Sequence, residues 1–106
     1  MIKHLGIFQF KQGVTTDQIE HCFSELRKMV GQIPGLIKIE HGPHNSDEGL
    51  DDGFTHGFCM TFDSVESRDS YLPHPVHQQR VALIQPILER VIVLDFEATP
   101  ERTASL

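Results

Sequence analysis

The stretch from Tyr71 to His77 concentrates side chains that could carry acid–base chemistry. It reads Tyr-Leu-Pro-His-Pro-Val-His, which places one tyrosine and two histidines close together. Pro73 and Pro75 fix their own φ angles and restrain the residues before them, so the backbone around His74 is stiff. Imidazole changes charge near neutral pH, so His77, held close to Tyr71, could move a proton in a dry pocket.

The residues after Pro75 predict the element that positions His77. Proline suits the first position of a helix, and we expect this helix to run over residues 75–85. The spacing puts His77 on the inward, apolar face of the helix, together with Val81, Ile84 and Leu88. A structural role is the alternative interpretation, because Tyr71 and His77 could simply satisfy each other in a core.

Two further histidines lie on predicted strands. Residues 3–10 alternate, with His4 and Phe8 on one face, and residues 54–63 alternate in the same way. The shared face of this second strand carries His56, Phe58, Met60 and Phe62.

The remaining elements complete an α+β pattern. We expect a helix from Thr15 or Thr16 to Ile33, a strand over 36–42, an exposed loop to Gly53, a short helix capped by Ser64, and a strand over 91–96. The order β-α-β-β-α-β predicts a ferredoxin-like fold, with a four-stranded antiparallel sheet and both helices on one face. Residues 1–97 form one predicted domain, and residues 98–106 a flexible tail.

The other face of the predicted sheet is also apolar, because it carries Leu5, Ile7, Cys59 and one side of residues 91–96. A large exposed apolar face is costly for a monomer. We therefore expect a homodimer that packs two such faces together and buries roughly 1,600 Å² or more.

The composition excludes several classes of partner. The net charge is −6 and no basic cluster is present, which argues against binding to nucleic acid or to an anionic membrane. The longest apolar runs are strand-sized and no signal-peptide pattern is found, so we expect a cytoplasmic protein. Cys22 and Cys59 are isolated within apolar patterns and are expected to be free, buried thiols.

The sequence predicts neither a cofactor nor a metal. It contains no glycine-rich phosphate loop, no nucleophile elbow and no HExxH motif. Oxygen atoms of residues 45–52 could in principle hold Mg²⁺ or Ca²⁺, but a solvated acidic loop is the simpler interpretation.

Several segments, taken in order, resemble the stress-responsive dimeric α/β-barrel family. They are Lys3-His4-Leu5 with Phe8-Gln-Phe10-Lys11, Ile33-Pro-Gly-Leu36, Gly53-Phe-Thr-His56, Phe62-Asp-Ser-Val-Glu66, Tyr71-Leu-Pro-His-Pro-Val-His77 and Asp95-Phe96. The resemblance spans residues 3–96, and it implies a homodimer whose two sheets form a barrel with the helices outside.

The resemblance also implies roles for individual residues. One enzyme of the family closes a linear polyketide without a metal or organic cofactor, using a histidine as base and a tyrosine as its partner. The matching positions here are His77 and Tyr71, and two further pocket histidines match His4 and His56. We therefore expect these four side chains to converge on one cavity, with His74 at its rim and Phe8 and Phe58 in its apolar wall.

Two functions follow from these residues. The first is cofactor-free acid–base chemistry, of a cyclase, lyase or isomerase kind, on a small carbonyl or polyketide-like compound. The second is a non-catalytic dimer that binds an apolar ligand or protects against stress. A cavity of a few hundred Å³ that reaches His77 would favour an enzyme or a binder. A pocket filled by Phe8, Phe58 and Phe62 would favour a structural role.

Overall fold

A computed structural model describes residues 1–105, which form four strands, three α-helices and one 3₁₀ turn. The elements are β1 (Ile2–Phe10), α1 (Thr16–Arg27), β2 (Leu36–Pro43), β3 (His56–Phe62), α2 (Val65–Tyr71), α3 (Pro75–Ile84), the 3₁₀ turn η1 (Gln85–Ile87) and β4 (Leu88–Glu97).

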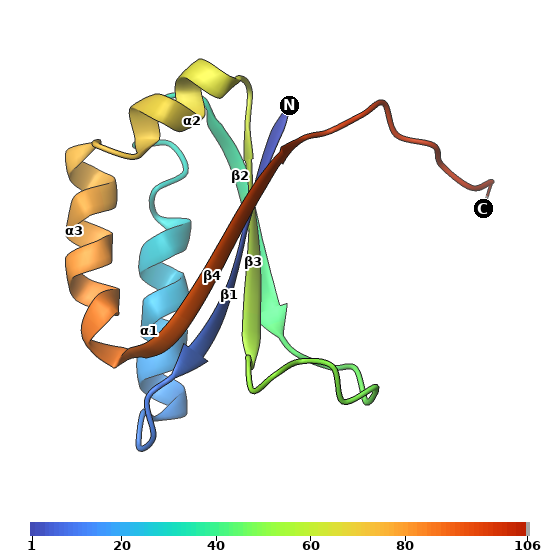
Figure 1. Cartoon of the computed structure of the whole chain (residues 1–106). Coiled ribbons are helices and arrows are strands. Elements are labelled where there is room, and N and C mark those ends of the chain that lie inside the picture. Colours follow the sequence, from blue (N-terminus) through green and yellow to red (C-terminus); the bar gives the residue numbers. More distant parts are fainter. Residues whose placement is uncertain (106) are drawn as a thin grey trace.

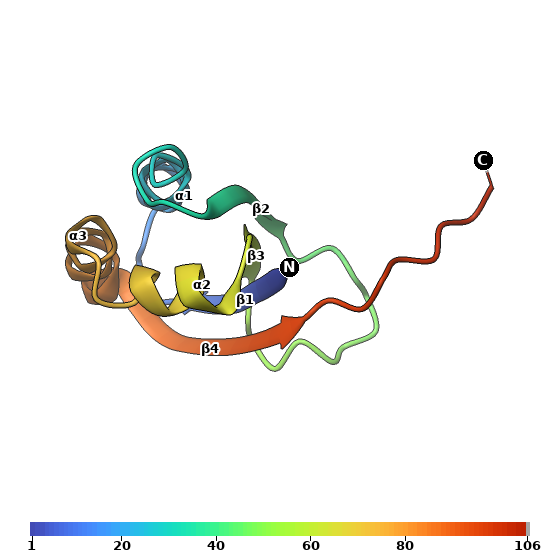
Figure 2. The ribbon, with the colours of Figure 1, turned by 90° about the horizontal axis from the view of Figure 1, so that it is seen from above.

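The strands form one antiparallel sheet in the order β2-β3-β1-β4, and the helices lie on one of its faces (Figures 1 and 2). This arrangement confirms the predicted ferredoxin-like fold. The second helical segment consists of α2 and α3, which are separated by the turn around Pro73. None of the helices in residues 1–105 is long and apolar enough to cross a membrane.

The core lies between the helices and the sheet. On β1, His4 and Phe8 are buried while Ile7 is exposed, as the period of two predicted. Burial of apolar side chains against the helices is the main stabilising term for this layer. The buried cluster includes Phe23, Leu26, Met29, Ile33, Met60, Phe62, Tyr71 and Ile84.

The boundaries of two elements, the first helix and the last strand, differ most from prediction. The first helix was expected to reach Ile33, but α1 ends at Arg27, and turns carry the chain on to β2. Met29 and Ile33 are still buried, whereas Val30 is exposed. These three residues follow the end of α1, so the spacing of an α-helix no longer determines which of them point toward the core. The last strand was expected over 91–96 and instead begins at Leu88, because β1 is long enough to pair with it up to Phe10.

A bulge in β2 changes the direction of one apolar side chain. Leu36 pairs with Phe62 but Lys38 pairs with Thr61, so Ile37 is an extra residue in this strand. Strict alternation along the strand would put Ile37 on the same face as Ile39, but with the bulge Ile37 is exposed.

The face of the sheet opposite the helices is apolar and uncovered in the single chain. Leu5 pairs with Leu94 and Ile7 with Ile92, so these side chains share this face, and both β4 residues are exposed. The 44–55 loop and the residues after β4 extend beyond the sheet on this side (Figure 1). Residues 98–105 contain no helix or strand, and Leu106 lies outside the described residues.

Candidate active site

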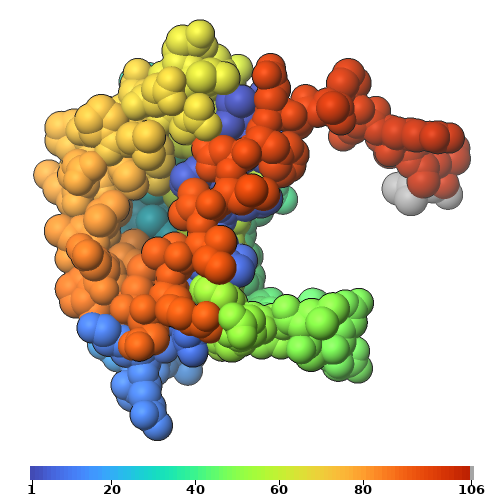
Figure 3. All heavy atoms as spheres, in the orientation of Figure 1, coloured from blue at the N-terminus to red at the C-terminus, as the bar shows by residue number. Residues whose placement is uncertain are grey.

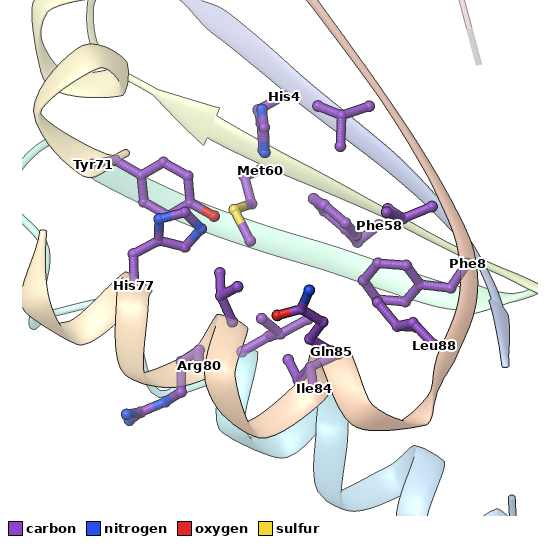
Figure 4. A pocket seen from close by; sticks show the side chains of 14 residues that line it. His4, Phe8, Phe58, Met60, Tyr71, His77, Arg80, Ile84, Gln85 and Leu88 are labelled. Atoms are coloured by element: carbon purple, nitrogen blue, oxygen red, sulfur yellow. The ribbon is translucent and has the colours of Figure 1, made fainter. Parts of the chain in front are cut away.

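A cavity of about 280 Å³ lies between α3, β4 and the inner face of the sheet. In the space-filling view, the surface is hollowed between α3 and β4 (Figure 3). Most of its walls are apolar, and the side chains that line it include His4, Phe8, Phe58, Tyr71, His77 and Ile84 (Figure 4).

The inner face of the sheet carries three rows of residues that pair across β3, β1 and β4. The members of these rows that line the cavity are Met60, His4, Phe58, Val93, Phe8 and Val91. The polar row consists of Met60, His4 and Asp95, the middle row of Phe58, Gly6 and Val93, and the outer row of His56, Phe8 and Val91. Side chains that pair across strands share a face, so all three rows point toward the helices. Neighbouring rows are two residues apart, which is roughly 6.7 Å along a strand.

Local sequence fixes the start of the helix that carries His77. Pro75 occupies the first turn of α3, and the Nδ1 atom of His74 accepts a hydrogen bond of 3.1 Å from the Val76 amide. His74 is therefore the N-cap of α3, and it is not among the described residues that line the cavity.

A contact between helices holds α3 over the cavity. The Nε group of Arg80 donates a hydrogen bond of 3.1 Å to the carbonyl oxygen of Glu25 on α1. The same Nε lies 3.3 Å from Oε2 of Glu25, and both side chains are mostly buried. In Figure 4 the guanidinium of Arg80 points away from the other labelled side chains. Its role is to join α3 to α1.

His77 is held as a neutral imidazole with one free nitrogen. Its Nδ1 group donates a hydrogen bond of 3.0 Å to the carbonyl oxygen of Leu72. Burial lowers the pKa of His77, and the nearby His4 and His74 lower it further, although the Leu72 carbonyl acts in the opposite direction. Because Nδ1 carries the proton, Nε2 is the nitrogen that can accept one.

Tyr71 lies against His77 and keeps its proton. The two rings are stacked, with centroids 3.9 Å apart and an angle of 28° between their planes. Tyr71 is 2% exposed, and burial raises the pKa of its hydroxyl, with the negative charge of Asp95 adding to the rise. Figure 4 shows the hydroxyl directed toward the cavity. It is therefore suited to donate a hydrogen bond to a ligand oxygen.

The second imidazole in the cavity, His4, is held by a carboxylate. Nδ1 of His4 lies 2.6 Å from Oδ1 of Asp95, and Nη1 of Arg68 donates a hydrogen bond of 2.8 Å to Oδ2 of Asp95. The His4 ring lies 5.6 Å from that of Tyr71, measured between centroids. Asp95 and Arg68 were not predicted to belong to the site. Asp95 could have been found as the one acidic residue among the apolar residues 91–96.

His56 does not join this group, and the prediction that it lies beside His4 is wrong. In the antiparallel pairing, His4 faces Met60 and His56 faces Phe8, so the two histidines lie about 13 Å apart along the strands. His56 packs beside Phe23 under α1, where His41 also stacks on Phe23 with centroids 4.5 Å apart. Burial lowers the pKa of both His41 and His56.

The described residues provide no side-chain cluster typical of a metal site. Across residues 1–105, no three His, Cys, Asp or Glu side chains come together in a way that could hold a metal ion. Cys22 and Cys59 are both free, and Cys22 is buried. Burial raises the pKa of Cys22 to about 11, so its thiol is a poor nucleophile near neutral pH.

Comparisons with known proteins identify the family. Residues 2–98 match the model of the stress responsive A/B barrel domain. The chain is 29% identical to olivetolic acid cyclase of Cannabis sativa over 101 residues, which cover 95% of this chain and 98% of that protein.

Solved structures give the same relationship. The crystal structure of At3g17210 from Arabidopsis thaliana has a TM-score of 0.91 and 30% identity, covering 97% of this chain and all of that one. A dimeric ferredoxin-like protein from Jannaschia sp. CCS1 has a TM-score of 0.80 and 25% identity, covering 92% and 98% of the two chains. The chain therefore belongs to the stress responsive A/B barrel domain family.

Proposed function

We propose that the cavity binds a small carbonyl compound and that His77 removes a proton from the carbon next to the carbonyl group. The observation that carries this proposal is the His77–Tyr71 pair on an apolar cavity. His77 presents a basic Nε2 because Leu72 holds its Nδ1 proton, and Tyr71 beside it keeps its own proton. A base and a hydrogen-bond donor on one cavity can act on a carbonyl compound together.

The proposed step is balanced within the ligand and these two residues. The α-carbon loses its proton to Nε2 of His77, and the electron pair moves into an enolate. The Tyr71 hydroxyl donates a hydrogen bond to the enolate oxygen. The enolate then either takes the proton back from His77 or attacks a second carbonyl carbon of the same ligand. The attack closes a ring and leaves an alkoxide, which takes the proton from the protonated His77. The similarity to olivetolic acid cyclase supports this class of chemistry.

We also propose that the protein works as a homodimer through the open face of its sheet. The apolar residues of that face would be covered by the same face of a second copy. The dimeric relative from Jannaschia sp. CCS1, at a TM-score of 0.80, supports this assembly.

The exchange of α-protons for deuterium tests the chemistry directly. The protein is incubated with 2-heptanone in D₂O, and loss of the α-proton signals is followed by NMR. His77→Gln should slow the catalysed exchange by about 10²–10⁴-fold, because the base is lost. Tyr71→Phe should slow it by about 10²–10³-fold, because the enolate loses a hydrogen-bond donor.

His21→Gln is the control, since it removes a surface imidazole on α1. It should leave the exchange rate unchanged. If His77→Gln and His21→Gln change the exchange rate equally, the His77–Tyr71 pair does not catalyse this step.

Non-catalytic binding is the second candidate, because stacking on Tyr71 and a bond to Leu72 would also satisfy a structural histidine. In that case His77→Gln would lower the free energy of unfolding by about 1–3 kcal/mol, through lost partners. The wild-type protein would then bind the ketone without exchanging its protons.

A further inference from the structure

A glycine and a phenylalanine share the middle row of the cavity. Gly6 on β1 pairs with Phe58 on β3, and a Cβ atom added to Gly6 would overlap the Cε2 and Cζ atoms of the Phe58 ring. The ring therefore occupies the space that any other side chain at position 6 would need. Because Gly6 has no side chain, Phe58 can lie against the backbone of β1.

The surroundings of Phe58 determine where its ring would go if that space were filled. Along the inner face of the sheet it packs between His4 and Phe8, with centroids 5.7 Å and 5.5 Å away. Beneath it is the backbone of β1 at Gly6, and on its remaining side is the cavity that it lines. The atoms that would clash are at the far end of the ring, which can rotate. A side chain at position 6 would push the ring into the cavity.

The cavity has different chemistry at its two ends. The polar row, with His4 and Asp95, lies at the same end as Tyr71 and His77. The middle and outer rows contribute Phe58, Val93, Phe8 and Val91 to the walls, all of which are apolar. A ligand that satisfies both ends has one polar head group and one apolar tail.

We propose that Gly6 and Phe58 set the length of the apolar tail that this cavity accepts. The ligand class is a carbonyl compound with an unbranched tail, whose head lies at the polar row and whose tail passes over Phe58 toward the outer row. The inference rests on the proposed function for the position of the carbonyl group. It adds the residues that select among carbonyl compounds.

Binding of straight-chain methyl ketones, from 2-butanone to 2-nonanone, tests the proposal. The chain has one tyrosine and no tryptophan, so its intrinsic fluorescence reports on Tyr71 in the cavity wall. For the wild type, affinity should rise about fourfold with each added CH₂ group while that group is buried. The rise should stop at the length where the tail has filled the outer row.

Two variants should move this limit in opposite directions. Gly6→Ala pushes Phe58 into the cavity, so the rise should stop at a shorter ketone. Phe58→Val removes the ring, so the rise should continue to a longer one. The double variant should return toward the wild-type limit, because the alanine methyl group fills part of the space that the ring leaves.

Gly42→Ala is the matched control. It adds the same methyl group to a strand at the far edge of the sheet, and a Cβ atom there meets nothing within 4 Å. Its length limit should equal that of the wild type. If Gly6→Ala does not fold, the dependence of affinity on ketone length in Phe58→Val is by itself the test of the proposal.

The proposal is overturned if no ketone binds, or if Phe58→Val has the wild-type length limit. Absence of ketone binding would also overturn the proposed function, whereas an unchanged length limit for Phe58→Val would not. A limit that shifts without any proton exchange contradicts only the catalytic step. If proton exchange depends on His77 but the length limit is the same in all variants, only the role of Gly6 and Phe58 is contradicted.

Discussion

Nδ1 of His4 lies 2.6 Å from Oδ1 of Asp95, and this contact joins β1 to β4 within the polar row. The carboxylate accepts a hydrogen bond from the Nδ1–H group, which leaves Nε2 of His4 as the nitrogen available to a ligand. The second oxygen of Asp95 accepts a hydrogen bond from Arg68 on α2. One carboxylate thus fixes the orientation of an imidazole in the cavity and ties α2 to β4.

Replacing Asp95 tests this contact. Asp95→Asn removes the charge that both His4 and Arg68 contact, so the free energy of unfolding should fall by about 1–3 kcal/mol. Urea denaturation measures the change, and nitrogen chemical shifts of His4 report whether its proton stays on Nδ1. Asp69→Asn is the control, because Asp69 contacts the same Arg68 at 2.9 Å but is largely exposed. It should cost less than about 0.5 kcal/mol, and equal costs for the two variants would contradict the buried role of Asp95.

The lowered pKa of His77 predicts a loss of stability in mild acid. In the unfolded chain His77 takes up a proton as the pH falls through its ordinary value of 6.5, while the folded protein resists protonation until its lower pKa is reached. The unfolded state therefore binds more protons in this window, and stability should fall from about pH 6.5 downward. The lowered pKa values of His41 and His56 also reduce stability as the pH falls.

Urea denaturation at a series of pH values between 5 and 8 measures this slope. His77→Gln should be less sensitive to pH than the wild type, because one of the three contributing imidazoles is gone. Lowered carboxylate pKa values, at Glu25 and Asp63, cause their own losses only near and below ordinary values of 4.5 and 3.8. A His77→Gln curve parallel to that of the wild type above pH 5 would show that His77 is not held neutral.

A charge on the open sheet face should separate the dimer. Leu94 is 61% exposed in the single chain and pairs with Leu5 on that face. Leu94→Glu would place an unpaired charge inside the proposed interface, so a monomer is expected at micromolar concentration. Light scattering measures the mass. Val65→Glu is the control, since Val65 is a 40% exposed apolar residue on α2, and this variant should remain a dimer.

The two thiols should differ in reactivity once the dimer is separated. Cys22 is buried by its own chain, and its pKa is raised to about 11, so it should react slowly with a thiol reagent in every folded form. Cys59 is half-buried and pairs with Leu5 on the open face. It should react slowly in the wild type and quickly in Leu94→Glu, and equally fast labelling in both forms would place Cys59 outside the interface.

Features that depend on neighbouring residues were predicted correctly from the sequence. The Ser64 cap, the start of α3 at Pro75 and the alternation of His4 with its neighbours all follow from local rules. These rules place His77 at the start of a helix and His4 on the inner face of a strand. The predicted order of elements was sufficient for the fold.

Features that depend on the register between strands were missed or wrong. Periodicity assigns a residue to a face but does not say which residue it pairs with, so it could not separate His56 from His4. The same limit hid Asp95, which reaches His4 only through the β1–β4 pairing. The bulge at Ile37 also follows from pairing, and its alternating neighbours gave no sign of it.

The separation of the cavity into rows has a consequence for how such a protein can diversify. The polar row and the middle row are carried by the same three strands, yet their side chains are about 6.7 Å apart. A mutation at Gly6 or Phe58 therefore alters the dimensions of the cavity while the hydrogen bonds of Asp95 stay in place. Under the proposed function, the size of the ligand and the reactivity toward it would be two separate traits, each set by one or two codons.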